Sequence, residues 1–403
     1  MAGRTLATRF LAGALCMAAW TPYLPLTVQY LVYGAVGFCA VALGWQRSNW
    51  RATARHPLFV LALAWWTWLL LSATWSSADA AARLAHGWTY SLMLWVPWVG
   101  MAAAPEDGQR ALRHFVVASC LVAVLWLVDA TGFTAGWPWR PIADITGNQR
   151  IAMSLMLALA CALALDLALR TVDRRPRLAW AAAALLCLSG LMHQDRRTGL
   201  VAAPVLALLV LVAHQRGWRR RVATTAGVLL AAALAWQLSP LVQQRFDEGL
   251  SEVRAYRSEG DVRTSWGMRL RMVEVTSRMA LERPLAGHGL GSWAGEWRRR
   301  VTGSELLQGH TTPHNEYLLL AFQGGLVAWA LLLALCGRAV LGAVRHHGHG
   351  VPALLVLVAF AWCGLTNVAL RDAKFALPLL TMAGMAWAAA RASSAPPSSK
   401  MPS

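Results

Sequence analysis

The chain has 403 residues, of which 57% are hydrophobic and only 14% are charged. Because a soluble domain carries about a quarter charged residues, this composition predicts a membrane protein. The formal net charge of +18 would otherwise suit a nucleic-acid-binding protein. The sequence has no soluble basic domain that could carry that function, so we exclude nucleic acid as a partner.

Twelve apolar segments along the chain predict membrane-spanning helices. A span needs about 20 predominantly apolar residues, and the most apolar runs reach that length once their Trp, Ser, Gly and Thr flanks are included. We interpret the first segment as an uncleaved helix rather than a signal peptide, because no convincing small-x-small cleavage site precedes the next span. The expected spans are 7–25, 28–45, 57–75, 87–104, 111–129, 150–169, 177–193, 198–214, 222–238, 315–337, 350–367 and 374–390.

The distribution of positive charge predicts the orientation of these spans. With both termini inside, nineteen Lys and Arg residues fall in the inner segments and seven in the short outer loops. This excess agrees with the positive-inside rule. We therefore expect an all-α polytopic membrane protein with both termini in the cytoplasm, and much of its net charge is a topological signal.

One outer segment is long. It runs from Ser239 to Pro313 and contains 11 Arg and 9 Asp or Glu, and a loop of this length is more often functional or disordered than a mere connector. Its stretches "VQQRFDEGLSEVRAYRS" and "WGMRLRMVEVTSRMALER" have helical spacing, so we expect amphipathic helices on the outer membrane face. The predicted organisation is nine spans in 1–238, this loop in 239–313, three spans in 314–391 and a disordered cytoplasmic tail in 392–403.

Arg269 stands out in the second of these expected helices. At 100° per residue it lies on the apolar face, opposite a charged stripe whose spacing of 3, 4 and 4 residues favours pairing within the helix. A cation on an apolar face is costly unless an anion meets it. We therefore predict an anion-binding arginine, with a snorkelling or internally paired side chain as the structural alternative. The stripe consists of Arg271, Glu274, Arg278 and Glu282.

Two further arginines occur in "HQDRRTGL", residues 193–200, which joins two spans at the outer face. Asp195 can cap the following helix, which leaves Arg196 and Arg197 in its first turn, where the helix dipole disfavours cations. A diphosphate would suit this place, because guanidinium groups bind phosphate bidentately and the free N–H groups of a helix start add to the site. Pairing with Asp195 or with lipid headgroups is the alternative.

A histidine occurs in "TTPHNEYLLL", residues 311–320, where a polar stretch leads into an apolar helix. Thr312 is a plausible N-cap and Pro313 a good first helical residue. His314 would then lie in the first turn, where the dipole favours a neutral imidazole that can accept a proton. We predict a general base, with a cap or interface residue as the alternative.

Other polar features predict no metal and no cofactor. All seven cysteines fall inside predicted spans, where they are expected to be small packing residues rather than a disulfide or metal framework. His310 and His314 are four residues apart, a spacing that would suit a metal site on one face of a helix. Pro313 between them interrupts such a helix, so we predict no metal site there. The glycines of "GHGLGSW", residues 287–293, predict a bend, because the strand and Lys of a nucleotide-binding loop are missing.

Three of these stretches together resemble the O-antigen ligase and polymerase superfamily. "DRRTGL" resembles its Ser-Arg-Thr/Gly motif, "SWGMRLRMVEV" followed by "PLAGHGLGSW" resembles its R-x-x-x-W…P-L-x-G-x-G-x-G segment, and "PHNEYLLLAFQGGL" resembles its H-N-x-x-L…G-x-x-G segment. The motif order, the long outer loop and the twelve-span layout are also similar. This resemblance implies a GT-C-like glycosyltransferase architecture.

The resemblance also implies a reaction and its residues. A ligase would transfer O-antigen polysaccharide from undecaprenyl diphosphate to a sugar hydroxyl of lipid A–core, on the periplasmic face of a Gram-negative inner membrane. Arg197 and Arg269, with Arg196 as a third candidate, would bind the donor diphosphate, and His314 would activate the acceptor hydroxyl. The reaction would be metal-independent and would invert the anomeric centre.

Two residues after His314 have expected supporting roles, and three positions differ from the family motifs. Asn315 and Glu316 are expected to support the histidine or an acceptor hydroxyl. Arg196 stands where the motif usually has serine, Val273 stands where a tryptophan is usual, and His288 occupies a position that is commonly aliphatic. None of these departures removes a charged group that the implied mechanism needs.

Three other functions remain open from the sequence. An O-antigen polymerase would use the same donor with a second lipid-linked glycan as acceptor, and a protein O-oligosaccharyltransferase would glycosylate a protein. A lipid-linked oligosaccharide flippase belongs to another class and should show charged groups along a path through the membrane. The predicted spans are almost free of charge near their centres, which favours an enzyme with its polar groups at one face.

Overall fold

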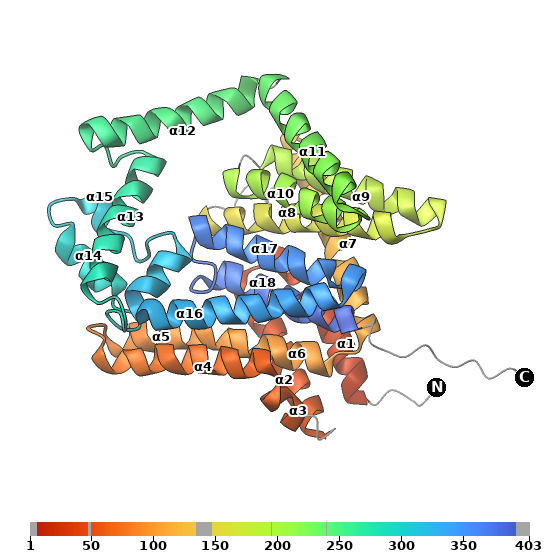
Figure 1. Ribbon diagram of the computed structural model, residues 1–403, viewed down its shortest axis with the longest axis horizontal. Coiled ribbons are helices and arrows are strands. Elements are labelled where there is room, and N and C mark those ends of the chain that lie inside the picture. The colour runs from red at the N-terminus through yellow and green to blue at the C-terminus, as the bar shows by residue number, and fades with distance from the viewer. Residues whose placement is uncertain (1–5, 47–49, 134–146, 195, 239, 392–403) are drawn as a thin grey trace, which may run out of the picture.

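The computed structural model describes residues 6–46, 50–133, 147–194, 196–238 and 240–391, and these residues form helices and turns without a strand (Figure 1). The elements, with 3-10 helices marked η, are α1 Leu6–Ala18, η1 Thr21–Tyr23, α2 Leu26–Gln46, α3 Trp50–Arg55, α4 Pro57–Ser72, η2 Ala73–Trp75, α5 Ala80–Ser91, η3 Leu92–Leu94, α6 Trp95–Ala102, α7 Pro105–Ala130, α8 Gly147–Arg170, α9 Arg174–His193, α10 Arg197–Ala213, α11 Trp218–Leu238, α12 Pro240–Glu259, α13 Ser265–Glu282, α14 Trp293–Arg300, α15 Glu305–Gln308, α16 Glu316–Arg345, η4 His347–Gly350, α17 Val351–Thr366 and α18 Ala373–Ala390.

Each of the twelve predicted spans coincides with a helix or with a short series of helices. The segment predicted as 87–104 differs most, because it is divided among α5, η3 and α6. Within the described residues, six helices are long and apolar enough to cross a membrane (α2, α4, α7, α8, α16 and α18), and α10 and α17 are shorter apolar helices. The protein is therefore an all-α polytopic membrane protein, while the count of twelve spans and the orientation of the termini stay predictions.

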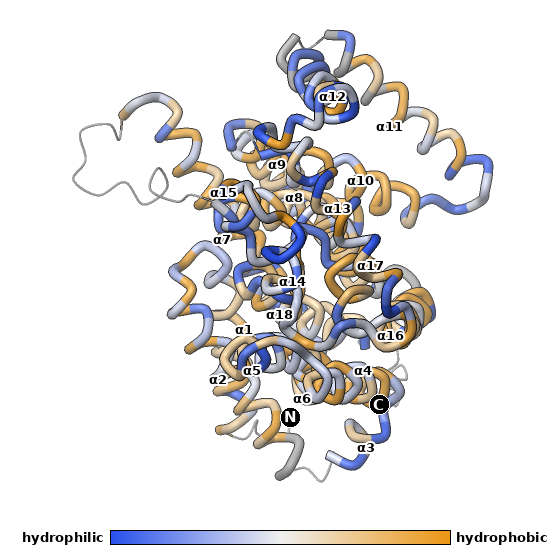
Figure 2. The backbone as a smooth tube through the Cα atoms, turned by 90° about the vertical axis from the view of Figure 1, so that its left-hand side faces the viewer, coloured by the Kyte–Doolittle hydropathy of each residue, from blue (hydrophilic) through white to orange (hydrophobic). Residues whose placement is uncertain are grey.

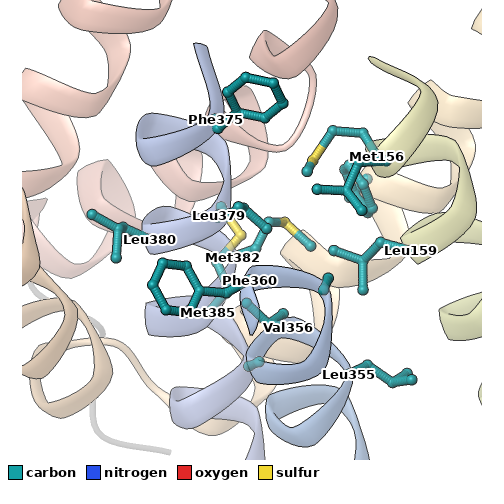
Figure 3. Close-up of a cluster of buried hydrophobic side chains, with 14 of the residues drawn as sticks. Met156, Leu159, Leu355, Val356, Phe360, Phe375, Leu379, Leu380, Met382 and Met385 are labelled. Atoms are coloured by element: carbon teal, nitrogen blue, oxygen red, sulfur yellow. The ribbon is translucent and has the colours of Figure 1, made fainter. Parts of the chain in front are cut away.

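The core of the bundle lies between α8, α17 and α18. Figure 3 shows Met156 and Leu159 of α8 converging with Phe360 of α17 and Met382 of α18, and all four are buried. Helices that are apolar on every side are buried on every side, and 83% of the α8 span is buried. This core is the frame on which the outer ends of the helices are fixed.

Close backbone contact fixes the start of α10 against α8. A Cβ atom added to Gly199 would lie only 2.4 Å from the Ser154 carbonyl oxygen of α8. Small residues allow helices in a membrane to approach in this way. In addition, the Trp362 indole of α17 donates to the Thr198 carbonyl oxygen at 3.0 Å. The segment that carries Arg197 is thus held by two helices of the bundle.

Helix α16 is interrupted at Gly325, which has φ 63° and ψ −160°. The loop after α13 supplies hydrogen bonds that the helix loses there. The Leu326 amide donates to the Pro284 carbonyl oxygen at 2.8 Å, and the His288 amide donates to the Phe322 carbonyl oxygen at 2.7 Å. A Cβ atom on Gly325 would lie 2.3 Å from a carbonyl oxygen of this loop, so only glycine fits the break.

The loop itself confirms the predicted bend. Gly287, Gly289 and Gly291 have φ values of 70°, 95° and 80°, a backbone region that glycine adopts without strain. Through this loop the outer segment is bonded directly to the broken helix α16. As a result α13, α14 and α15 lie at one end of the bundle, on the left in Figure 1.

The two helices predicted in the outer segment are present as α12 and α13. In Figure 1 α12 reaches from the end of α11 across to α13, and Figure 2 shows it among the more hydrophilic helices, whereas α16 and α4 are mostly hydrophobic. The segment 392–403, predicted as a disordered cytoplasmic tail, lies outside the described residues. The polar groups of the candidate site come from the start of α10, from α12 and α13, and from the residues that precede α16 and α18.

Candidate functional site

Arg269 lies in the first half of α13, apart from the charged stripe. The helix is capped by Thr264, whose hydroxyl accepts the Gly267 amide at 3.1 Å. The Arg269 side chain is half-buried and its guanidinium carbon lies 5.9 Å from the Trp266 ring centre. Burial lowers its pKa, the nearby positive charge of Arg197 lowers it further, and Glu252 acts in the opposite direction. Arg269 is therefore a cation held in unfavourable surroundings.

The charged stripe on the opposite face of α13 was predicted to pair within the helix, and three of its four residues do so. Glu274 accepts from Arg278 at 2.7 Å and from Arg271 at 3.4 Å. Glu282 instead pairs with Arg300 of α14, at 2.6 Å. Because these charges are satisfied by one another in exposed positions, the stripe does not need a ligand.

Arg197 is the first residue of α10, and Arg196 is its N-cap residue without a side-chain cap bond. The Nη2 atom of Arg197 lies 3.8 Å from the Glu248 carboxylate of α12. The Arg196 Nε atom is buried and has no hydrogen-bond partner among the residues that the structure describes. The predicted cap, Asp195, lies outside those residues. Two guanidinium groups thus stand at the start of one helix, where the dipole disfavours them.

Helix α12 places two carboxylates, one turn apart, beside this arginine pair. Glu248 faces Arg197, and the Glu252 carboxylate accepts the Trp266 backbone amide at 2.9 Å. Gly249 lies between the two glutamates on α12. A Cβ atom added to it would lie 3.3 Å from the indole nitrogen of Trp266 in α13, so α12 and α13 are in contact. These carboxylates cannot be recognised from the sequence, because their partners are 51 residues upstream and 14 residues downstream.

His314 lies just before α16, and here the predicted helix start was wrong. The N-cap residue is Asn315, whose Oδ1 atom accepts the Leu318 amide at 2.9 Å, rather than Thr312. The Asn315 Nδ2 atom also donates to the Leu365 carbonyl oxygen at 3.0 Å. His314 has φ 50°, a left-handed conformation that costs about 1 kcal/mol or more for such a residue.

The predicted neutral state of His314 has a different cause from the one proposed. Burial lowers its pKa to about 4, aided by the charges of Arg269 and His310 and opposed by Asp372. The helix dipole is not needed, because His314 precedes the first turn. The His310 and His314 rings lie 5.7 Å apart in an edge-to-face arrangement. Within the described residues, no cluster of three or more potential metal ligands occurs.

Glu316 supports this corner of the protein through the loop between α17 and α18. Its carboxylate is buried and accepts the Leu370 amide at 2.8 Å, the Arg371 amide at 3.3 Å and the Tyr90 hydroxyl at 3.4 Å. The Glu316 amide donates to the Asn367 carbonyl oxygen at 3.1 Å. Asn315 and Glu316 therefore hold the backbone on the helix side of His314, and they do not contact its imidazole directly.

Asp372, in the same loop, was missed by the sequence analysis. It caps α18 by accepting the Lys374 amide at 3.0 Å, and its carboxylate accepts from Asn148 at 2.8 Å. Its negative charge acts on His314. In the sequence, "LRDAKF" shows only a short charged outer loop, and an Asp at a helix start predicts a cap. Its approach to His314 depends on tertiary packing.

The structure brings three predicted residues into one site. The charge of Arg197 acts on Arg269, and the charge of Arg269 acts on His314, although these residues come from α10, α13 and the start of α16. The site thus combines closely spaced cations with a neutral imidazole at one end of a membrane-spanning bundle. Such an arrangement can bind a polyanion and accept a proton beside it.

Fold and site together define a polytopic membrane protein with neighbouring arginines and a neutral imidazole at one end of its helical bundle. A family model described as O-antigen ligase matches residues 182–333, the stretch that contains Arg197, Arg269 and His314. Over this stretch, which is less than half of the chain, the protein is similar to the O-antigen ligase family, and this similarity indicates a membrane glycosyltransferase-type enzyme. No curated protein matches the chain.

Proposed function

We propose that this protein is an O-antigen ligase that transfers O-antigen polysaccharide from undecaprenyl diphosphate to a sugar hydroxyl of lipid A–core. The reaction would take place at the periplasmic face of the inner membrane and would need no metal ion. The observation that carries the proposal is a neutral imidazole, His314, on which the charge of Arg269 acts, while the charge of Arg197 acts in turn on Arg269. Similarity to the O-antigen ligase family supports a lipid-linked polysaccharide donor and a lipid acceptor in general.

The arginines are suited to the donor diphosphate. Arg197 and Arg269 are like charges held near each other, and burial of Arg269 raises the cost of that arrangement. A diphosphate removes this cost, because each guanidinium can form two parallel hydrogen bonds to phosphate oxygens. Arg196, with its buried Nε atom, is the third candidate. Two or three guanidinium groups are enough to neutralise a diphosphate, which is why the proposed reaction does not require a metal.

His314 is suited to activating the acceptor. As the acceptor oxygen bonds to the anomeric carbon of the donor sugar, its proton passes to the imidazole. The bond between that carbon and the diphosphate oxygen breaks, and its electron pair leaves on the diphosphate. The arginines stabilise the charge that develops there. Attack from the side opposite the leaving group inverts the anomeric centre.

Donor binding would also strengthen the base. With a pKa of about 4 in the unliganded protein, His314 is fully neutral at pH 7 but weakly basic. The charge of Arg269 contributes to that low value, and a bound diphosphate would oppose it with negative charge. The pKa of His314 then rises towards the range in which a general base works best. The proposal therefore links donor binding to activation of the acceptor.

A reconstituted transfer assay tests the proposal. Purified protein is mixed with undecaprenyl-diphosphate glycan and lipid A–core in the presence of EDTA, and the wild type is compared with His314→Ala and Arg269→Ala. Arg278→Ala is the matched control, since Arg278 lies on the same helix and pairs with Glu274. We expect transfer by the wild type and the control, and a loss of about 100-fold or more in the two site variants.

The products distinguish the alternatives. Full transfer by His314→Ala, or loss of transfer on adding EDTA, would overturn the proposed mechanism. Lengthened glycans still on the undecaprenyl carrier would identify a polymerase, and glycan attached to an added protein acceptor would identify a protein O-oligosaccharyltransferase. Unmodified lipid-linked glycan moved across a vesicle membrane would identify a flippase.

A further inference from the structure

An apolar cavity lies at the other end of the bundle from the candidate site. It has a volume of about 110 Å³ and opens to the surroundings, and residues of α4, η3, α6, α16, α17 and α18 line it. On α16 the lining runs from Leu335 to Ala343. Leu335 is 19 residues beyond Glu316, which is roughly 30 Å along a helix. The cavity is thus separate from the residues assigned to glycan transfer.

Small and apolar side chains leave this space unfilled. Its lining includes Ala62, Ala339, Gly342 and Ala353, and His346 is the one lining residue with an ionisable nitrogen. Such a void is unfavourable because side chains around it lose contacts, and protein interiors are normally close-packed. A hydrocarbon chain would restore those contacts. Water would not, because it needs two to four polar partners.

An arginine without a partner lies beside this cavity. Arg338 belongs to α16, is half-buried, and forms no hydrogen bond or ion pair with any residue that the structure describes. Its Nη1 atom lies 4.0 Å from the position of a Cβ on Gly342, a lining residue. Arg338 lies one residue beyond the predicted span 315–337, where the predicted topology places it near the cytoplasmic headgroups. A guanidinium without a protein counter-charge in this position attracts anionic headgroups, which is the second independent sign of a ligand.

The groups around Arg338 do not supply that counter-charge. His56 lies near it and accepts the Leu58 amide at 3.3 Å through Nδ1, which requires an unprotonated nitrogen. Burial lowers the pKa of His56, and the charge of Arg338 lowers it further, so the local potential is positive. The His56 ring lies 4.7 Å from Trp387, which lines the cavity. No carboxylate is among the lining residues.

We propose that this cavity binds one acyl chain of an anionic glycerophospholipid, whose phosphate lies against Arg338. The apolar lining matches the chain, the unpaired guanidinium matches the phosphate, and basic groups near a membrane surface attract anionic lipids. The predicted topology places this end of the bundle at the cytoplasmic leaflet. The occupant is thus a bound membrane lipid that is neither donor nor acceptor of the proposed transfer.

Lipid retention tests the proposal on the purified full-length chain in mild detergent. Extracted phospholipid is counted per protein for the wild type, for Arg338→Gln, which removes the charge, and for Ala339→Phe, which fills the cavity. The controls are Arg345→Gln at the end of the same helix and Leu333→Phe on its exposed side. We expect about one anionic phospholipid in the wild type and controls, and roughly fivefold less in the two variants. Equal retention in all five proteins would overturn the proposal.

An add-back experiment identifies the ligand. Thermal unfolding of delipidated protein is followed with phosphatidylglycerol, glycerol 3-phosphate, inorganic phosphate or undecaprenyl phosphate. Stabilisation by phosphatidylglycerol alone, absent in Arg338→Gln and in Ala339→Phe, supports the proposal. Equal stabilisation by free phosphate would show that the chain is irrelevant and would overturn it, as would a preference for undecaprenyl phosphate. Because no step depends on glycan transfer, the result stands whether or not the proposed function does.

Discussion

Replacing Glu248 by Gln should tighten the binding of diphosphate to the arginine pair. In the unliganded protein the Glu248 carboxylate lies 3.8 Å from Nη2 of Arg197, in a place that a donor phosphate would need. Glu252, one turn further along α12, acts electrostatically on Arg269. The carboxylates of α12 would therefore compete with the diphosphate of the proposed donor. Glu248→Gln keeps the shape of the side chain and removes its charge.

The expected size of the effect follows from the distance and the exposure of the pair. Two unit charges 3.8 Å apart attract by about 1 kcal/mol at the dielectric constant of water and by about 4 kcal/mol at an effective value of ~20. The two side chains are 40% and 39% exposed, so solvent screens the pair and the lower figure applies. Exposed ion pairs contribute about 0.2–1 kcal/mol, which corresponds to a dissociation constant for diphosphate lowered by roughly 1.4- to 5-fold.

Isothermal titration of purified protein with inorganic pyrophosphate measures this change directly. The difference between wild type and Glu248→Gln should shrink as NaCl is raised from about 50 to about 300 mM, because salt screens exposed charges. Glu259→Gln, which removes a charge from the far end of α12, should bind like the wild type. Unchanged affinity would refute competition. Weaker binding would show instead that Glu248 holds Arg197 in place for the donor.

Three further predictions concern the histidine, the helix break and the buried carboxylate. In an NMR titration of the unliganded protein, His314 should show a pKa of about 4, so that it is neutral above pH 5. Pyrophosphate should raise this pKa. An unchanged pKa would contradict the proposed link between diphosphate binding and the basicity of His314. Gly325→Ala should destabilise the protein by about 1–3 kcal/mol, seen as a shorter half-life on heating, whereas Gly337→Ala, with open space around its Cβ position, should be neutral or stabilising. Glu316→Ala leaves backbone amides of the α17–α18 loop without an acceptor, and each such amide costs about 1–3 kcal/mol of stability. Glycan transfer and thermal stability should therefore both fall. If both were unchanged, the loop would not depend on this carboxylate.

The helical bundle could be predicted from the sequence because its rule is local. A membrane-spanning helix satisfies its own backbone hydrogen bonds, so length and apolar composition are sufficient to locate it. The division of the 87–104 segment among α5, η3 and α6 escaped prediction because the segment was assigned from its overall apolar composition, although Pro97 lies in its middle. The count of apolar residues does not show where a helix tightens into a 3-10 turn.

The start of α16 shows how tertiary contacts override a local signal. Thr312 and Pro313 form a favourable helix start by sequence, yet the helix begins at Glu316. The later start allows Asn315 to bond both its own helix and the end of α17, and the buried Glu316 carboxylate to hold the next loop. No local pattern contains these partners, which are about 50 residues further along the chain.

The residues of the candidate site belong to two differently held parts of the protein. Arg269 and His314 belong to one bonded unit, because the loop after α13 is joined to α16 at the Gly325 break and His314 directly precedes α16. Arg197 belongs to another, since α10 is fixed to α8 and α17 and meets α12 through an exposed ion pair. His314 and Arg269 therefore keep a fixed relation, whereas Arg197 would reach a bound diphosphate from the bundle. A diphosphate that binds both arginines would join the two units where only a weak contact joins them in its absence.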